Sequence, residues 1–540
     1  MYLSLVQEYR YELAYTLLVI ARIVFAFAGM GYIHPDEYFQ NGEITAGSVF
    51  GLHTLKTWEW DPSFPCRSIV PPALTTGVAF KILNRFYDNV SPAQLFRTER
   101  ASSLLASFYL DIYVYSFTQH NPMLALTLLA SSHVMFTFQA RPFSNSHEAF
   151  TLVLAFKRLR KLTQSATITS FQWNLGMLAA IIVEGMFLRM TFAAFAAPIV
   201  LEALAQLFQL SREGGAIKFT ALLRNSTPAI FCVAAAYLVY VGIDSVYFTG
   251  STEHPVLTPY NFLLYNLSPE NLAQHGIHPR WLHVAVNLPM ILGPSLFVAG
   301  VYACWQTWRE VQTVKENPSG GPVARINRVC AGIIIFALSL LSLQPHQEPR
   351  FLVPLVFPTT LLVANSGVIE RLGTTFWVTT AVFNFALAVV FGILHQGGVV
   401  PSLFRVHELM SQSNHSSAIV YWKTYMPPRH LLAIPEADVQ AGRVFITDLA
   451  GEDADAVPSV LSSLPSGDGR TDVYLVTPPF AARSLDQRTA DCLKLDKRIF
   501  PHLDLDHIPE SVEMGWREGL SLGIYLAELE CLKAAGDPLS

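Results

Sequence analysis

Two adjacent carboxylates, Asp36 and Glu37, stand in a polar stretch, residues 34–40, that directly follows an apolar run over residues 13–30. The run is long enough to cross a bilayer, and ionised side chains at its boundary are a functional-site hypothesis by default. Pro35 turns the chain out of the membrane. Neighbouring side chains point in different directions. One carboxylate can therefore face a substrate while the other caps a helix or pairs with a cation. The alternative is that both only form an acidic N-cap.

A second polar insertion, residues 346–351 (His-Gln-Glu-Pro-Arg-Phe), separates two apolar segments. Its charged side chains, His346, Glu348 and Arg350, fall at the ends of two predicted helices. Together they could bind a phosphate, because a guanidinium stays charged and grips two oxygens at once. The alternative is that Glu348 and Arg350 pair only to close a tight helical hairpin.

Two further polar interruptions occur in apolar sequence. Arg189 must face protein or water if it lies in a membrane. It either contacts a phosphate or stabilises Glu184 on the same helix. Residues 141–145 (Arg-Pro-Phe-Ser-Asn) are the other interruption, and their alternative role is a helix break with capping residues.

Neither the histidines nor the cysteines predict a metal site. His34 lies beside Asp36 and Glu37, but no second cluster has metal-ligand spacing. The six cysteines are scattered without a CxxC pair, which gives neither a zinc site nor a disulfide framework. Cys492 and Cys531 could pair in an oxidising compartment.

The composition predicts the elements that must position these residues. Of 540 residues, 51% are hydrophobic and only 14% are charged, against about 25% in a soluble domain. This indicates an all-α polytopic membrane protein with about 11 transmembrane helices. A net charge of −5 gives no indication of nucleic-acid binding. The predicted spans are 11–31, 68–84, 101–118, 122–138, 172–188, 189–208, 228–249, 284–304, 329–343, 351–367 and 375–394.

Basic residues predict the orientation. The densest cluster is residues 157–161. Three more groups contain Arg309, Lys315, Arg325 and Arg328; Arg212, Lys218 and Arg224; and Arg85, Arg97 and Arg100. The positive-inside rule makes these groups cytoplasmic. The basic-poor connections 32–66 and 250–283, the 344–350 turn and everything after 395 then lie on the far side. Sequons at Asn266 and Asn414 would be glycosylatable there, whereas those at Asn89 and Asn225 would be silent.

The composition changes near residue 400. Strand-like runs appear at residues 444–446 and 473–476 among polar stretches. We predict two domains: residues 1–399 embedded in the membrane, and residues 400–540 forming a small soluble α/β region on the lumenal side.

These motifs resemble the endoplasmic reticulum mannosyltransferases of glycosyltransferase family 22, which belong to the membrane-embedded GT-C class. The resemblance rests on residues 34–40, 141–145, 260–289 and 346–351, which occur in the family's order. It covers residues 1 to about 400. Gln347 stands where the family usually has Lys, which removes one positive charge from the predicted phosphate site.

The resemblance implies a GT-C helical bundle and an inverting transfer from dolichol-phosphate mannose, without a cofactor. Such a transfer needs one general base and a group that stabilises the leaving phosphate. Asp36 is the preferred base and Glu37 the second choice. His34, Arg189, His346, Glu348 and Arg350 are the predicted substrate-binding residues, and no residue is predicted to bind metal.

Within the family, the sequence most resembles the branch that adds a fourth, α1,2-linked mannose to the GPI-anchor precursor. The expected partners are therefore the lipid-linked donor, the GPI glycolipid acceptor and the endoplasmic reticulum membrane, with a lumenal active site. The alternatives are another member of the family, acting on the third GPI mannose or the N-glycan precursor, and a lipid or solute transporter.

Overall fold

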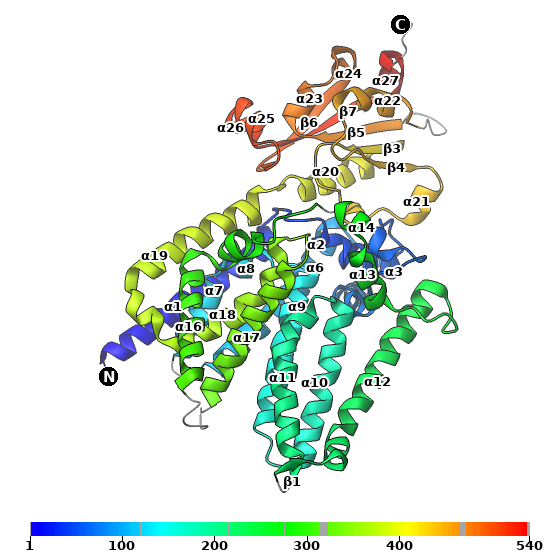
Figure 1. Ribbon diagram of the computed structural model, residues 1–540. Helices are drawn as coiled ribbons and strands as arrows, with labels where there is room; N and C mark the ends of the chain where they lie inside the picture. The colour runs from blue at the N-terminus through cyan, green and yellow to red at the C-terminus, as the bar shows by residue number, and fades with distance from the viewer. Residues whose placement is uncertain are drawn as a thin grey trace. The chain divides into compact units, whose positions relative to one another are not determined.

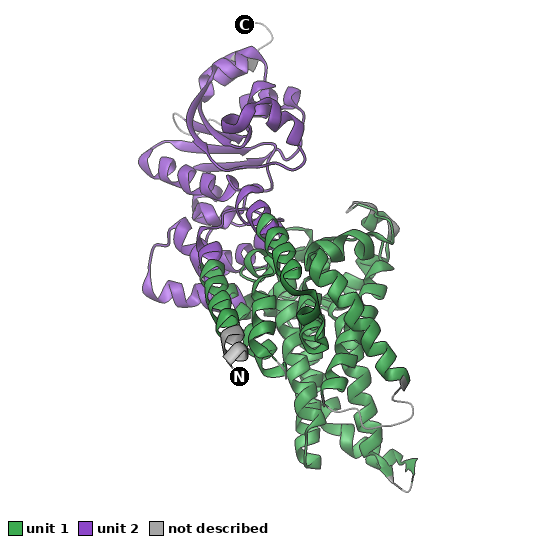
Figure 2. Ribbon diagram, turned by 90° about the vertical axis from the view of Figure 1, so that its left-hand side faces the viewer, with its two compact units in different colours: residues 1–23, 57–74, 103–386 green, residues 24–56, 75–102, 387–540 purple. Residues whose placement is uncertain are grey.

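The computed structural model describes residues 2–118, 121–213, 215–274, 276–313, 322–464 and 471–536. The chain divides into two compact units, coloured separately in Figure 2. Unit 1 contains residues 1–23, 57–74 and 103–386. Unit 2 contains residues 24–56, 75–102 and 387–540. These units follow packing, whereas the predicted boundary at residue 400 separates membrane-embedded from soluble sequence. That boundary stays a prediction.

Unit 1 is helical (Figure 1). Its long helices are α9 (Ser144–Thr163), α10 (Ile168–Leu188), α11 (Phe192–Leu210), α12 (Phe219–Thr249), α16 (Pro294–Thr313), α17 (Pro322–Ser342) and most of α19 (Val368–Val389). Shorter elements are η1 (Trp58–Trp60), α4 (Val70–Pro72), α7 (Pro122–Ala130), α8 (His133–Thr137), β1 (Arg212–Glu213), β2 (Ala216–Ile217), α13 (Thr258–Leu267), α14 (Pro269–Gln274), η3 (His283–Asn287), α15 (Leu288–Leu292), η5 (Pro349–Leu355) and α18 (Val356–Ser366). Most of α1 (Tyr2–Ala28) and of α6 (Pro92–Phe117) also belongs to this unit.

The membrane character of the chain is confirmed, but the number of spans stays a prediction. Among the described residues, six helices are long and apolar enough to cross a bilayer, or seven if the bent pair around Gly293 is one span. The predicted spans 122–138 and 351–367 instead form shorter helices, α7–α8 and η5–α18, whose residues are mostly buried in protein. An apolar run does not reveal whether protein or lipid covers it.

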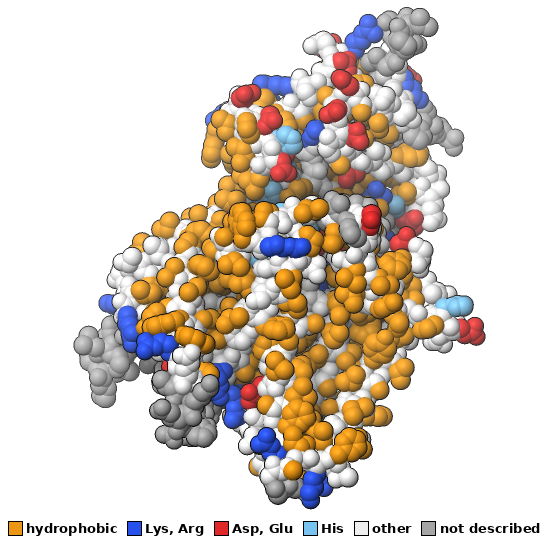
Figure 3. All heavy atoms as spheres, in the orientation of Figure 1, with side chains coloured by type: hydrophobic (Ala, Val, Ile, Leu, Met, Phe, Trp, Pro, Cys, Tyr) orange, Lys and Arg blue, Asp and Glu red, His pale blue; other side chains and the backbone are white. Residues whose placement is uncertain are grey.

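Basic side chains mark one end of the unit 1 helices. Residues 157–161 lie in the last turns of α9. Between α11 and α12, Arg212 begins β1 and Lys218 directly follows β2. Figure 3 shows hydrophobic side chains over the visible faces of α10, α11 and α12, with basic side chains near the β1 end. The start of α9 and the end of α10 therefore lie at the opposite end, away from the positive charge.

Within the apolar helices, Arg22 of α1 is completely buried. Its guanidinium donates two hydrogen bonds, of 3.0 and 3.2 Å, to the carboxylate of Asp111 in α6. An Arg inside a membrane requires such a partner, so this ion pair fixes the first helix to the bundle.

Unit 2 contains a five-stranded sheet in the order β4-β3-β5-β7-β6, formed by β3 (Ser416–Tyr421), β4 (Val444–Asp448), β5 (Thr471–Thr477), β6 (Leu493–Ile499) and β7 (Leu522–Glu528). Strands β4, β3 and β5 are parallel, and β7 runs antiparallel to β5 and β6. The strands predicted at 444–446 and 473–476 are β4 and β5. The expected all-α membrane protein with a small C-terminal α/β region is thus confirmed.

Successive strand residues face opposite sides of a sheet, and both faces of this one are covered. Ala418 and Val420 pack with α22 (Val457–Ser462) and α27 (Leu529–Gly536). Ile419 and Tyr421 pack with α20 (Val399–Gln412) and with Tyr38 and Phe39 of the polar stretch 34–40, here called the acidic motif. The motif thus belongs to the same hydrophobic core as the C-terminal sheet.

The remaining elements of unit 2 are short. They are α2 (Asp36–Phe39), α3 (Gly42–Phe50), α5 (Val78–Phe86), η7 (Arg429–Leu432), α21 (Glu436–Gln440), η8 (Ala454–Ala456), α23 (Pro479–Arg483), α24 (Gln487–Asp491), α25 (Ile508–Glu513) and α26 (Gly515–Gly519). The unit also contains the π-helix η6 (Val390–Leu394) and most of the π-helix η2 (Ala73–Gly77).

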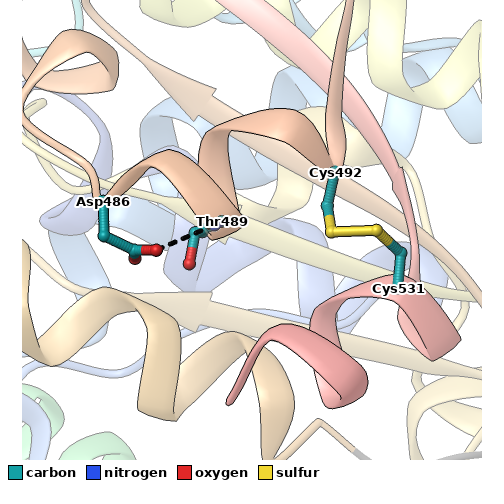
Figure 4. The surroundings of a disulfide bond; sticks show 4 residues. All are labelled: Asp486, Thr489, Cys492 and Cys531. Atoms are coloured by element: carbon teal, nitrogen blue, oxygen red, sulfur yellow. Dashed lines mark hydrogen bonds between the residues drawn. A yellow bond between two sulfur atoms is a disulfide. The ribbon is translucent and has the colours of Figure 1, made fainter. Parts of the chain in front are cut away.

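A disulfide joins Cys492, which directly precedes β6, to Cys531 of α27 (Figure 4). Asp486 accepts a hydrogen bond from the Thr489 N–H, which caps α24 next to this bond. The sequence allowed this pair without requiring it. Disulfides persist in oxidising compartments, which agrees with the predicted non-cytoplasmic location of the C-terminal region.

One part of the predicted orientation is wrong. The positive-inside rule predicts that Arg100 is cytoplasmic and residues 34–40 are not, yet Arg100 hydrogen-bonds to Glu37, and both belong to unit 2. Two residues in contact must lie on the same side of the membrane. Arg100 is completely buried, so its charge neutralises a carboxylate and carries no information for the positive-inside rule, which concerns loops.

This correction changes the predicted glycosylation pattern. Asn89 and Asn414 are both exposed and both belong to unit 2. We expect N-glycans at both positions in eukaryotic cells, and none at Asn225, which is buried near the basic end of α12. Glycosidase-sensitive gel shifts of Asn89→Gln, Asn414→Gln and the control Asn225→Gln measure this. A glycan at Asn225 alone would reverse the orientation.

Candidate active site

The two adjacent carboxylates have different surroundings. Both lie in the first turn of α2, which follows Pro35. The Glu37 side chain is completely buried, and Arg100 of α6, equally buried, donates to its Oε1 atom. Arg100 also donates to the Tyr38 hydroxyl at 3.2 Å. Glu37 is therefore the carboxylate that pairs with a cation.

Asp36 is the accessible member of the pair, with one fifth of its side chain exposed. Gln40 donates to its Oδ2 atom. His34 Nδ1 lies 3.3 Å from Asp36 Oδ1 and 3.2 Å from the Asp36 backbone N–H. Since a backbone N–H can only donate, Nδ1 accepts from it, and the His34 proton belongs on Nε2. His34 is therefore a hydrogen-bond acceptor for the backbone of Asp36.

The acidic N-cap alternative does not describe this geometry. Residue 35 occupies the N-cap position and makes no side-chain cap hydrogen bond. The two carboxylates have instead separated into a buried ion pair at Glu37 and a partly exposed acid at Asp36.

A second buried charge cluster lies in unit 2. His430 of η7 contacts Glu43 through Nδ1 at 2.5 Å and Glu99 through Nε2 at 3.3 Å, and all three side chains are completely buried. Glu43 also accepts from the backbone N–H groups of Leu55, Arg429 and His430. Burial alone would lower the pKa of His430, but the carboxylates of Glu99 and Glu43 raise it to about 9.

In unit 1, Phe351 of η5 is the centre of a cationic cluster. The guanidinium carbons of Arg189 and Arg350 each lie 5.5 Å from the centre of its ring. The His346 ring centre lies 5.7 Å from it. The structure thus brings together the three residues that the sequence assigned to a phosphate.

Glu348 balances part of this charge. Its Oε1 atom accepts from His346 Nε2 at 2.7 Å and from Arg350 Nη2 at 2.9 Å. Burial opposes protonation of His346, but Glu348 raises its pKa above the ordinary value. The Glu348–Arg350 pair of the hairpin alternative is therefore present, and it also orients Arg350 beside Phe351.

Arg189 follows the last residue of α10. It lies 3.4 Å from Glu148 of α9 and donates to the Ser144 hydroxyl at 2.9 Å. Glu148 thus takes the position as ion-pair partner that the sequence suggested for Glu184. Ser144, in the 141–145 motif, begins α9, so this motif both starts a helix and supplies a ligand to Arg189.

The structure gives Gln347 a different role from the one expected. Its side chain is buried, its Oε1 atom accepts from the His283 N–H at 2.8 Å, and its Nε2 atom donates to the carbonyls of Ser342 and Gln344 at 3.1 Å. Position 347 therefore holds the backbone of the turn, where an ammonium could not accept the hydrogen bond from His283.

The predicted site residues fall into two groups. His34, Asp36 and Glu37 belong to unit 2, and Arg189, His346, Glu348 and Arg350 belong to unit 1. No local pattern indicates a role in the site for Glu43, Arg100 or His430, because their partners are distant along the chain. Over the described ranges, no group of three His, Cys, Asp or Glu residues gathers in a way that could hold a metal ion.

The apolar helices, the acidic motif and the 346–351 turn with its cationic side chains fit the class of membrane-embedded sugar transferases that the sequence resembles. This chain belongs to the Alg9-like mannosyltransferase family, whose sequence model matches residues 13–433. Membership favours an enzyme over the lipid or solute transporter that charged residues among helices also allowed.

Its similarity to individual proteins is more specific. The chain is 31% identical to human GPI alpha-1,2-mannosyltransferase 4, over 92% of this chain and 90% of the relative. It is 33% identical to GPI mannosyltransferase 4 of Emericella nidulans, over 77% and 76%. Among solved structures, apo ArnT from Cupriavidus metallidurans matches with a TM-score of 0.49 and 11% identity, covering 97% of this chain and 98% of the other.

The buried histidine predicts a pH dependence of stability. An unfolded His has a pKa near 6.5, whereas that of folded His430 is about 9. Protonation of His430 thus stabilises the fold fully below about pH 6.5, and this stabilisation is lost as the pH rises through about 9. The thermal unfolding midpoint of the purified protein should decline over that interval.

His430→Gln should lower the midpoint at neutral pH and flatten the decline. The matched control is His415→Gln, because His415 is an exposed histidine paired with Asp472 in the same unit. Equal pH profiles for the wild type and His430→Gln would show that His430 does not carry the effect.

Proposed function

We propose that this protein transfers mannose from dolichol-phosphate mannose to a GPI-anchor precursor at the lumenal face of the endoplasmic reticulum membrane. The product would carry a fourth, α1,2-linked mannose. The observation that carries the proposal is the match to relatives named GPI mannosyltransferase 4, which extends along most of both chains. The disulfide and the location of the cationic turn away from the basic end of unit 1 agree with a lumenal site.

In the proposed reaction, an acceptor hydroxyl attacks C1 of the donor mannose. The bond from C1 to the phosphate oxygen breaks, and dolichyl phosphate leaves with the electron pair. A single displacement of this kind inverts the configuration at C1. It needs one base for the hydroxyl proton and positive charge for the phosphate.

Asp36 is the proposed base, because it is the carboxylate of the pair that keeps solvent access. Glu37, committed to Arg100, is proposed to fix the orientation of α2 and so of Asp36. Only one of the two adjacent carboxylates needs to accept the proton. The buried ion pair with Arg100 accounts for Glu37 without a part in the reaction.

The cluster around Phe351 is proposed to bind the donor phosphate. Arg189, His346 and Arg350 bring three cationic groups against the two carboxylates of Glu148 and Glu348, which leaves a positive balance for an anion. Guanidinium groups suit this role because they bind phosphate oxygens in pairs.

Substitutions at positions 36 and 37 should have opposite effects on stability and turnover. Asp36→Asn should leave the amount of folded protein unchanged and reduce the rate by about 10²–10⁴-fold, the usual contribution of a general base. Glu37→Gln leaves Arg100 charged and buried without its partner, which costs about 3–5 kcal/mol of folding free energy. The folded fraction of Glu37→Gln should nevertheless turn over.

Rates per folded molecule, with folded protein measured by size-exclusion chromatography, separate these effects. Normal turnover in Asp36→Asn with none in folded Glu37→Gln would make Glu37 the base and Asp36 a structural residue.

The acceptor is tested directly. Purified protein should transfer radiolabelled mannose from dolichol-phosphate mannose to a trimannosyl GPI lipid. Transfer to a dimannosyl GPI lipid should be at least about tenfold slower, because the two acceptors present different terminal hydroxyl groups. Mass spectrometry and α1,2-mannosidase digestion identify the product. Preferential elongation of the dimannosyl lipid would assign the chain to the preceding step.

A further inference from the structure

His283 is a completely buried residue at the start of η3 in unit 1. Its backbone N–H donates to the Gln347 side chain at 2.8 Å, so it is attached to the 346–351 turn. Its ring centre lies 6.3 Å from that of Phe351. His283 therefore belongs to the same cluster as Arg189, His346 and Arg350, although no motif in the sequence singled it out.

Its protonation follows from its neighbour. The Asn287 amide nitrogen lies 3.0 Å from His283 Nδ1. An amide nitrogen can only donate, so Nδ1 accepts and a neutral imidazole carries its proton on Nε2. Nε2 is buried and has no hydrogen-bond partner within the part of the chain that the structure describes.

A buried N–H group without a partner is rare and calls for an explanation. The chemistry around His283 indicates what kind of partner would fit. An N–H donor requires an acceptor, and the groups around Phe351 have an excess of positive charge. The ligand that meets both conditions is an anion with several acceptor oxygens.

We propose that His283 Nε2 donates a hydrogen bond to the phosphate of the lipid-linked donor, and to dolichyl phosphate after transfer. The inference rests on the proposed function and adds a neutral donor to the cations already assigned. A neutral donor fixes the position of one phosphate oxygen without adding another buried charge next to Arg350.

Two variants separate the donor atom from the rest of the ring. In His283→Asn the amide oxygen can replace Nδ1 as the acceptor for Asn287, but nothing replaces Nε2. In His283→Gln an amide N–H can reach the position of Nε2. The matched control is His254→Asn, an exposed histidine in the same unit.

The experiment measures binding of dolichyl phosphate to full-length protein in lipid nanodiscs, with dolichol as the phosphate-free probe. His283→Asn should weaken dolichyl phosphate binding by about tenfold, the usual effect of one hydrogen bond, while His283→Gln and His254→Asn stay within about threefold. Without ligand, both His283 variants lose the ring that packs against Phe351, so the thermal midpoint should fall by similar amounts in both, whereas only His283→Asn should lose dolichyl phosphate affinity.

Two results would overturn the inference. The first is unchanged dolichyl phosphate binding in His283→Asn. The second is equal weakening of dolichyl phosphate binding in both His283 variants, which would make the residue structural. If the wild type binds dolichyl phosphate no better than dolichol, the proposed function fails as well, so the two failures are distinguishable.

Discussion

Buried charge that must be compensated is the constraint on which this structure depends. Arg100 neutralises Glu37, and His430 stands between Glu43 and Glu99, all within unit 2 and all without solvent access. Removing one partner of such a pair costs far more than the pair contributes, because the remaining charge cannot be hydrated. The packing is equally restrictive: a Cβ atom on Gly42 would collide with Glu99 and lie against His430. The acidic motif is therefore held by electrostatics as much as by apolar contacts.

The same constraint explains why the charges in unit 1 come in sets. Arg22 with Asp111, Arg189 with Glu148, and Arg350 with Glu348 each satisfy an ion in apolar surroundings. Arg22 and Asp111 balance each other one to one, and their ion pair joins α1 to α6. Around Phe351 the cations outnumber the carboxylates, which distinguishes this cluster from a purely structural pair and is consistent with the anion site proposed for it.

Much of this could be predicted from local sequence. The carboxylate pair, the polar turn at 346–351, Arg189 and two of the strands follow from residue types and spacing over a few positions. From the sequence alone, Arg100 resembles a cation in a cytoplasmic loop. Its burial, which only the structure shows, identifies it as the partner of Glu37. Apolar segments such as 351–367 resemble spans, since lipid and protein interiors select the same side chains. The partnership of Glu43 with His430 joins residues 387 positions apart, which no local pattern encodes.

The discontinuity of unit 2 has a consequence for biosynthesis. His430 follows Glu99 by 331 residues, and a ribosome adding about 5–20 residues per second needs roughly 17–66 seconds to produce that stretch. Throughout that interval the nascent chain carries Glu43 and Glu99 without their counter-ion. The shape of the N-terminal acidic motif is thus completed only by the arrival of the C-terminal segment. A chain that stops before residue 430 contains Asp36, Glu37, Glu43 and Glu99 but lacks the imidazole that lies between Glu43 and Glu99, so this buried charge cluster forms only after translation has passed that point.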